Sequence, residues 1–159
     1  MSNYPEMFVL RHGQTIWNLE GRHNSALTNL GIEQAKRQGE ILKQVGCAAR
    51  NLKCFSSPLE RASHTAAIAM QEIDGVVVHD RRLLEAKFGE WEGRNVSELQ
   101  PDLIVDNPTD ADPFGGYFKA PGGESFCEVK ARVQSFLDAV SEPTIVVTHG
   151  VTGRVLRGV

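Results

Sequence analysis

Two histidines and two arginines are the residues of this sequence best suited by type and position to chemistry. His12 and His149 each follow an apolar run and precede a glycine, Arg11 stands beside the first histidine, and Arg61 lies near a predicted helix start. Imidazole can act as a nucleophile, and guanidinium groups bind phosphate oxygens in pairs. A pocket that gathers these four side chains would attract a phosphate group and repel a metal ion. The pattern therefore predicts phosphoryl chemistry without a metal.

The elements that must gather these residues alternate along the chain. Apolar runs predict strands over residues 7–10, 52–56, 76–78 and 144–148. Spacing and capping signals predict helices over residues 31–45, from Ser57 onward and over 126–140, with Thr28, Ser57 and Ser125 as their N-caps. Residues 86–123 are rich in Gly, Pro, Asp and Asn and predict a long loop with one short helix near 96–99. Alternating strands and helices favour a mostly parallel sheet, whose ligands bind beyond the carboxyl ends of the strands.

Five short blocks follow one another over nearly the whole chain. They are Arg11-His12-Gly13-Gln14-Thr15 with Trp17-Asn18, Ser56-Ser57-Pro58-Leu59 with Arg61-Ala62, Leu84-Glu85 with Trp91-Glu92-Gly93, Pro121-Gly122-Gly123-Glu124-Ser125, and Val147-Thr148-His149-Gly150. In this order they resemble the signature of the histidine phosphatase superfamily, which includes cofactor-dependent phosphoglycerate mutases and many phosphomonoesterases. The resemblance implies a phosphoglycerate mutase-like α/β fold, a three-layer sandwich with a mostly parallel central sheet and helices on both faces.

The resemblance also implies a role for each candidate residue. His12 would be the nucleophile that forms a phosphohistidine, and neighbouring positive charges are expected to depress its pKa and keep its attacking nitrogen unprotonated. The groups expected to hold the phosphoryl oxygens are the side chains of Arg11, Asn18, Arg61 and His149 and the backbone N–H of Gly150. Glu85 would begin protonated and donate its proton to the leaving oxygen. Glu90 and Glu92 stand close by in the sequence as alternatives to it.

The function expected from this resemblance is that of a phosphoric monoester hydrolase of the histidine acid phosphatase type. Such an enzyme would be a metal-independent phosphomonoesterase acting on a small phosphorylated metabolite. A mutase usually carries a longer insertion with extra arginines, whereas the stretch from Arg94 to Ala120 is short and has no second arginine. Two alternatives stay open: a cofactor-dependent phosphoglycerate mutase-type phosphotransferase, and a phosphate-ester-binding protein with little turnover.

Length, charge and composition set the remaining expectations. The length of 159 residues predicts one domain. The resemblance implies that it is a single histidine phosphatase domain over 1–159, which stops short of the family pattern at its C-terminus. A net charge of −3 argues against a nucleic-acid partner, and no apolar run is long enough to predict a membrane span. Three scattered cysteines predict free thiols in a reducing compartment. We therefore expect a cytoplasmic protein that needs no cofactor, with a homodimer as one open arrangement.

Overall fold

A parallel sheet forms the centre of the protein. The computed structural model describes residues 4–16, 22–94, 99, 114 and 116–158. Within them the strands are β1 (Met7–Arg11), β2 (Lys53–Ser56), β3 (Val77–His79) and β4 (Thr144–Thr148), hydrogen-bonded in the order β1-β4-β2-β3. Every pair of neighbours among these strands is parallel. The expectation of a mostly parallel sheet is therefore confirmed.

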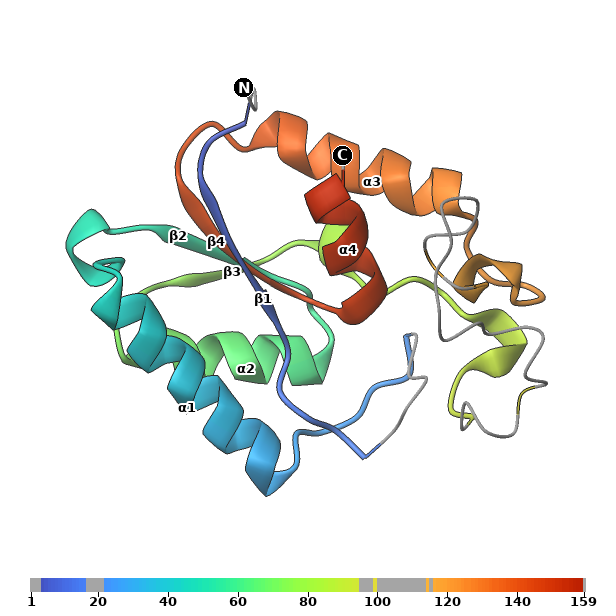
Figure 1. Cartoon of the computed structure of the whole chain (residues 1–159), viewed down its shortest axis with the longest axis horizontal. Helices are drawn as coiled ribbons and strands as arrows, with labels where there is room; N and C mark the ends of the chain where they lie inside the picture. Colours follow the sequence, from blue (N-terminus) through green and yellow to red (C-terminus); the bar gives the residue numbers. More distant parts are fainter. Residues whose placement is uncertain (1–3, 17–21, 95–98, 100–113, 115, 159) are drawn as a thin grey trace.

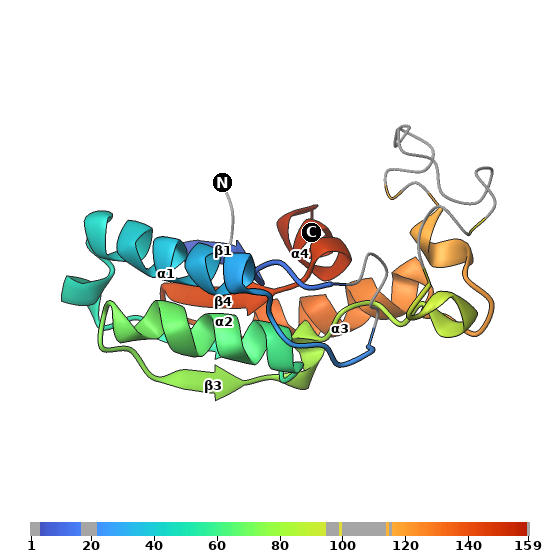
Figure 2. The ribbon, with the colours of Figure 1, turned by 90° about the horizontal axis from the view of Figure 1, so that it is seen from below.

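Helices cover both faces of this sheet (Figures 1 and 2). Helices α1 (Asn29–Gln44) and α2 (Glu60–Gln71) pack on one face, and α3 (Phe126–Ala139) and α4 (Gly150–Gly158) lie on the other. Short 3-10 turns are formed by Ala48–Arg50, Arg81–Leu83, Gly89–Trp91 and Tyr117–Lys119. Alternate residues of β4 point to opposite faces of the sheet. Ile145 and Val147 pack in the core beneath α1 and α2, and Val146 packs in the core beneath α3 and α4. This arrangement confirms the predicted three-layer sandwich.

Two of the three predicted helix starts are confirmed. The Thr28 hydroxyl accepts a hydrogen bond from the backbone N–H of Gly31 and caps α1. Ser125 and Glu128 form the reciprocal capping box that starts α3. Both signals act between residues three apart, so they can be recognised in the sequence without knowledge of the rest of the fold.

The predicted start of the second helix at Ser57 is wrong. Helix α2 begins at Glu60, with Leu59 as an extended N-cap residue at ψ 136°. The Ser57 hydroxyl instead lies 2.7 Å from Nε2 of His149, and the N–H of Glu60 donates to the side-chain oxygen of Asn24. Partners from distant parts of the chain have therefore replaced the local cap.

The last helix, α4, forms although it contains Gly150, Gly153 and Gly158, and glycine is a poor helix former. Glu85 is placed at the start of α4, where its carboxyl group accepts hydrogen bonds from the backbone N–H groups of Val151 and Thr152. These are donors that a helix cannot satisfy internally, so the Glu85 oxygens complete the hydrogen bonding of the first turn. The short helix predicted near 96–99 lies outside the described residues apart from Leu99. Within the described part of the chain, the helices are too short or too polar to cross a membrane.

A pair of glycines lets the loop after β1 touch α1. A Cβ atom added to Gly31 would lie 2.2 Å from the carbonyl oxygen of Gln14, and one added to Gly13 would lie 2.2 Å from the carbonyl oxygen of Gly31. We expect Gly31→Ala to destabilise the protein by about 3 kcal/mol, because backbone rather than a flexible side chain must move. Urea unfolding measures this. Gly158→Ala, which meets no atom within 4 Å, is the matched control, and equal stability of the two variants would contradict the prediction.

Candidate active site

The carboxyl ends of β1 and β4 place the two candidate histidines side by side. These strands are direct neighbours with Arg11 opposite Thr148, and the N–H of His12 donates to the carbonyl oxygen of Thr148 at 3.0 Å. The imidazole rings of His12 and His149 lie with centroids 5.1 Å apart. Arg61, in the first turn of α2, brings its Nε to 3.3 Å from Nε2 of His12. The structure thus brings together the side chains of His12, His149 and Arg61, three of the four residues predicted to form the pocket.

The hydrogen bonds of His12 determine which ring nitrogen carries the proton. Its Nδ1 lies 2.7 Å from the carbonyl oxygen of Gly13. A carbonyl oxygen only accepts, so the neutral ring holds its proton on Nδ1 and keeps a lone pair on Nε2. The contact from the Nε–H of Arg61 to this same Nε2 agrees with that assignment, because a guanidinium group only donates.

Both histidines are held in the neutral form. Burial lowers the pKa of His12 to about 4, and the charges of Arg61 and Arg11 act in the same direction, against the hydrogen bond to Gly13. Burial also lowers the pKa of His149 well below its usual range, with Arg61 and His12 as further causes. The expected depression of the His12 pKa by neighbouring charges is therefore present, although desolvation is its largest cause.

The lowered pKa of His12 predicts a loss of stability in acid. Below pH 6.5 the unfolded chain takes up a proton on this histidine, while the folded chain does not do so until about pH 4. Stability should fall across that window, by roughly 3 kcal/mol for His12 alone. Urea unfolding at pH 7.5 and pH 4.5 measures the loss. In His12→Ala it should be smaller by about that amount, and an unchanged loss would contradict the assignment.

A chain of buried contacts holds the Arg61 side chain and the loop after His12. The Arg61 side chain is 1% exposed, and its Nη1 donates to the carbonyl oxygen of His23 at 2.7 Å. The Thr65 hydroxyl donates to the carbonyl oxygen of Arg61 and accepts from the N–H of Gly13. The first turn of α2 and the loop carrying His12 are therefore fixed to each other, which positions the guanidinium group against the imidazole ring.

His149 presents one nitrogen atom that has no partner among the described residues. Its Nε2 lies 2.7 Å from the Ser57 hydroxyl, whereas its buried Nδ1 makes no hydrogen bond. A buried polar atom without a partner is costly, and such atoms are concentrated where a ligand supplies the missing bond. The arrangement suits a ring that meets a phosphoryl oxygen in the complex.

Glu85 is buried at the start of α4, the helix that begins directly after His149. Its Oε1 accepts from the N–H groups of Ala86 and Thr152 and lies 3.1 Å from the Thr152 hydroxyl. Among the described residues, its Oε2 accepts only from the N–H of Val151 at 3.2 Å, so Oε2 has the greater remaining capacity to contact a ligand. The two alternatives differ: Glu92 accepts from the N–H of Phe88 within its own loop, and Glu90 is exposed.

The remaining predicted residues are placed as follows. Arg11 is exposed, and its guanidinium carbon would lie 3.5 Å from a Cβ atom added to Gly150. Arg11 also lines a cavity of about 560 Å³ together with His12, Gln14 and residues of α1. Asn18 lies outside the described residues.

Sequence reasoning missed a set of side chains that support Glu85. The Thr152 hydroxyl lies 2.8 Å from the carbonyl oxygen of Leu84, and Nη2 of Arg132 lies 3.4 Å from that hydroxyl. Arg132 also pairs with Glu124, at 3.0 Å from its Nε. No local motif marks Thr152 or Arg132, because each is an ordinary helix residue until its partner is known.

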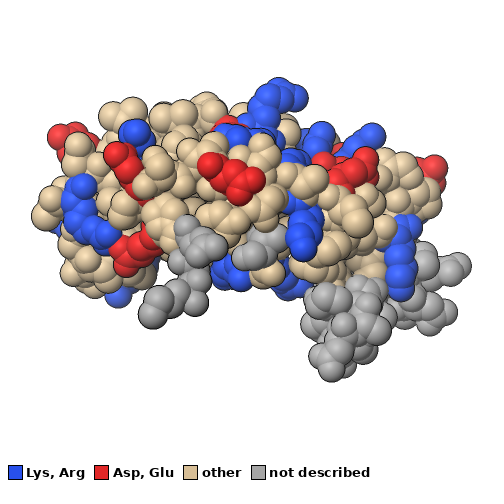
Figure 3. Space-filling view, turned by 90° about the horizontal axis from the view of Figure 1, so that it is seen from above, with Lys and Arg blue, Asp and Glu red and all other residues tan. Residues whose placement is uncertain are grey.

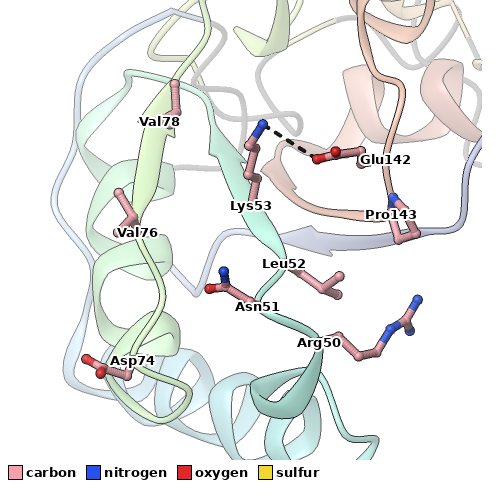
Figure 4. Close-up of a pocket in the computed structure, with 9 residues that line it drawn as sticks. All are labelled: Arg50, Asn51, Leu52, Lys53, Asp74, Val76, Val78, Glu142 and Pro143. Atoms are coloured by element: carbon pink, nitrogen blue, oxygen red, sulfur yellow. Dashed lines mark ion pairs between the residues drawn. The ribbon is translucent and has the colours of Figure 1, made fainter.

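A second, larger cavity lies at the opposite edge of the sheet. It has a volume of about 710 Å³ and is lined by residues at the amino ends of the strands, among them Lys53, Val76 and Pro143 (Figure 4). Its charged side chains are mixed, since Lys53 pairs with Glu142 at 3.6 Å. Ligand sites in parallel sheets lie beyond the carboxyl ends of the strands. The cluster around His12, and not this larger cavity, is therefore the candidate active site.

Comparison with known proteins identifies the family. The model of the histidine phosphatase superfamily (branch 1) matches residues 7–158. The chain belongs to this superfamily, and the resemblance expected from the five sequence blocks is confirmed.

Individual relatives cover most of this chain. The chain is 34% identical over 139 residues to the fructose-2,6-bisphosphatase TIGAR of Xenopus tropicalis. The aligned region covers 82% of this chain and 47% of the relative. It thus spans about half the length of that relative. A Proteus mirabilis protein named "Probable phosphoglycerate mutase GpmB" is 32% identical over 158 residues, covering 92% of this chain and 70% of the relative. The structure of a mycobacterial glucosyl-3-phosphoglycerate phosphatase matches with a TM-score of 0.74 and 27% identity, over 94% of this chain and 76% of that one.

Proposed function

We propose that the chain is a metal-independent phosphomonoesterase that acts on a small phosphorylated metabolite through a phosphohistidine. The observation that carries this proposal is the state of His12. Its Nε2 holds a lone pair because Nδ1 is bound to Gly13, and the Arg61 guanidinium lies 3.3 Å from that nitrogen. The nucleophilic nitrogen of His12 and the phosphate-binding guanidinium of Arg61 therefore lie close enough to contact the same phosphoryl group.

In the first step of the proposed reaction, the lone pair on Nε2 of His12 attacks phosphorus. The bond from phosphorus to the ester oxygen breaks as the new phosphorus–nitrogen bond forms, and Oε2 of Glu85 gives its proton to the leaving oxygen. Arg61 and His149 contact the phosphoryl oxygens, where charge accumulates in the transition state. Placing such donors in advance avoids the cost of reorganising them during the reaction.

In the second step, water attacks the phosphohistidine. The water proton passes to the carboxylate of Glu85, the phosphorus–nitrogen bond breaks, and its electron pair returns to Nε2 of His12. Inorganic phosphate leaves, and both residues regain their starting protonation. No group other than water and the ester is consumed.

The names of the relatives support a proposed substrate class, and the lowered pKa of His12 supports activity in mild acid. The names of the relatives describe phosphatases and a mutase of fructose bisphosphate and phosphoglycerate compounds, so we infer a substrate in the class of sugar phosphates and phosphoglycerates. Because the pKa of His12 is lowered to about 4, the nucleophile stays unprotonated in mild acid. This favours activity of the acid phosphatase type.

Hydrolysis of p-nitrophenyl phosphate between pH 5 and pH 8, in the presence of EDTA, tests the proposal. We expect release of p-nitrophenol and phosphate at a rate that chelator does not change. A rate that collapses in EDTA would overturn the metal-independent mechanism. Interconversion of 2- and 3-phosphoglycerate without release of phosphate would instead identify a mutase, and tight binding of the ester without turnover would identify a binding protein.

The variant Glu85→Gln distinguishes the proposed role of Glu85 as an acid from its structural role at the start of α4. We expect kcat/KM for glycerol 3-phosphate, an alkyl ester with a poor leaving group, to fall by about a hundredfold or more. For p-nitrophenyl phosphate, whose leaving group needs little protonation, the loss should be at least tenfold smaller. The variant should also be about 1 kcal/mol less stable, because a Gln amide offers one acceptor oxygen in place of two to the N–H groups at the start of α4. Glu92→Gln is the matched control, and equal losses with the two esters would contradict the assignment of Glu85 as the acid.

A further inference from the structure

A small cavity between β1 and α4 is surrounded by arginines. Its volume is about 200 Å³, and its polar lining consists of Arg11, Arg154, Arg157 and His149, with the backbone of Gly150 and Gly153. Among the residues that the structure describes, no aspartate or glutamate lines it. Arg154 and Arg157 stand three residues apart and therefore lie on neighbouring parts of one face of α4, which packs beside β1 (Figure 1).

The three positive charges around this cavity are not balanced within the described part of the chain. Five other described arginines have carboxylate partners; for example, Arg82 pairs with Asp80, Arg132 with Glu124, and Arg37 with Glu40. Arg11, Arg154 and Arg157 form no such ion pair with a described residue. Basic and acidic side chains are interspersed over the face seen in Figure 3. A bound anion at the cavity would relieve the mutual repulsion of the three arginines, and guanidinium groups bind phosphate and carboxylate especially well.

The cavity adjoins the candidate active site. It shares His149 with that site, and Arg11 lines both this cavity and the cavity beside His12. The guanidinium group of Arg11 lies against Gly150, which has no side chain to separate it from the start of α4. An anion in the cavity would therefore lie next to the phosphoryl group that His12 attacks.

We propose that this cavity binds a second acidic group of the substrate, a carboxylate or a second phosphate, and that Arg154 and Arg157 determine this specificity. The proposal rests on the phosphatase activity inferred above and narrows its substrate to doubly acidic phosphate esters. Arg11 contributes to both sites. Arg154 and Arg157 serve only the second acidic group, so a singly acidic ester should not depend on them.

The test compares 3-phosphoglycerate with glycerol 3-phosphate, which lacks the carboxylate. In the double variant Arg154→Gln/Arg157→Gln, we expect kcat/KM for 3-phosphoglycerate to fall at least tenfold and that for glycerol 3-phosphate to stay within twofold. The double variant Arg154→Lys/Arg157→Lys should recover part of the loss. Arg81→Gln is the control. Arg81 is exposed and follows β3, the edge strand opposite β1, so its replacement should change neither value. Thermal unfolding shows that each variant is folded.

Two other outcomes overturn the proposal. Equal losses with the two esters would assign the arginines a general electrostatic or structural role. A weaker inhibition by inorganic phosphate, with the preference for 3-phosphoglycerate unchanged, would make the cavity a site for a free anion and not for the substrate. If the wild type hydrolyses neither ester, the proposed function fails separately. Calorimetric binding of the two esters to wild type and variant then decides the question, because the subsite predicts weaker binding of 3-phosphoglycerate alone.

Discussion

Replacing His12 with alanine is expected to lower the turnover of p-nitrophenyl phosphate by at least a thousandfold. The variant loses the atom that forms the bond to phosphorus, and water at the same place is not held by the Gly13 carbonyl in an attacking orientation. A thousandfold loss corresponds to about 4 kcal/mol of barrier. Steady-state kinetics at pH 6 measure it, with the folded state of the variant checked by circular dichroism.

His64→Ala is the matched control for this variant. His64 is an exposed residue of α2, the helix that also carries Arg61, so its loss tests for a general effect of removing a histidine near the site. It should change turnover less than twofold. Rates for wild type and His12→Ala within tenfold of each other, about 1.4 kcal/mol of barrier, would exclude a phosphohistidine on His12. A phosphorylated intermediate trapped in base-quenched wild type, and missing from the variant, would support it directly.

The fold could be predicted from the sequence because its signals are local. The residues of β4 form a continuous apolar run, and all five are buried because helices cover both faces of this central strand. Thr28 and Ser125 each satisfy a backbone donor three residues away. The parallel order of the strands then brings His12 beside His149 without any further information.

Much of the support around the site could not be predicted, because it depends on partners far apart in the sequence. Ser57 has the local form of a helix cap, yet its hydroxyl contacts His149, 92 residues further along the chain. Glu85 was selected as an acid from a sequence block, but its position at the start of α4 depends on the backbone of Val151 and Thr152. A local pattern gives the types of these residues. Only the packed structure shows which of several plausible partners each one meets.

Replacing Arg61 tests whether a positive charge beside His12 is needed for catalysis. We expect Arg61→Met, which keeps much of the side-chain volume, to lower kcat/KM for p-nitrophenyl phosphate by about a hundredfold or more, because a phosphate-binding cation is removed from the transition state. Arg61→Lys should retain part of the activity, since it keeps the charge but loses the planar fork. Arg81→Met, at an exposed site in the 3-10 turn Arg81–Leu83, should have little effect.

The pKa of His12 distinguishes an electrostatic role of Arg61 from a purely structural one. The charge of Arg61 is one cause of the lowered value of about 4, although burial is the larger one. In Arg61→Met the pKa of His12, followed by NMR titration of its ring protons, should therefore rise part of the way toward 6.5. In Arg61→Lys it should rise less, because a positive charge remains near the ring. If both variants lose activity while the pKa of His12 stays at its wild-type value, Arg61 acts by shaping the pocket and not through its charge on the nucleophile.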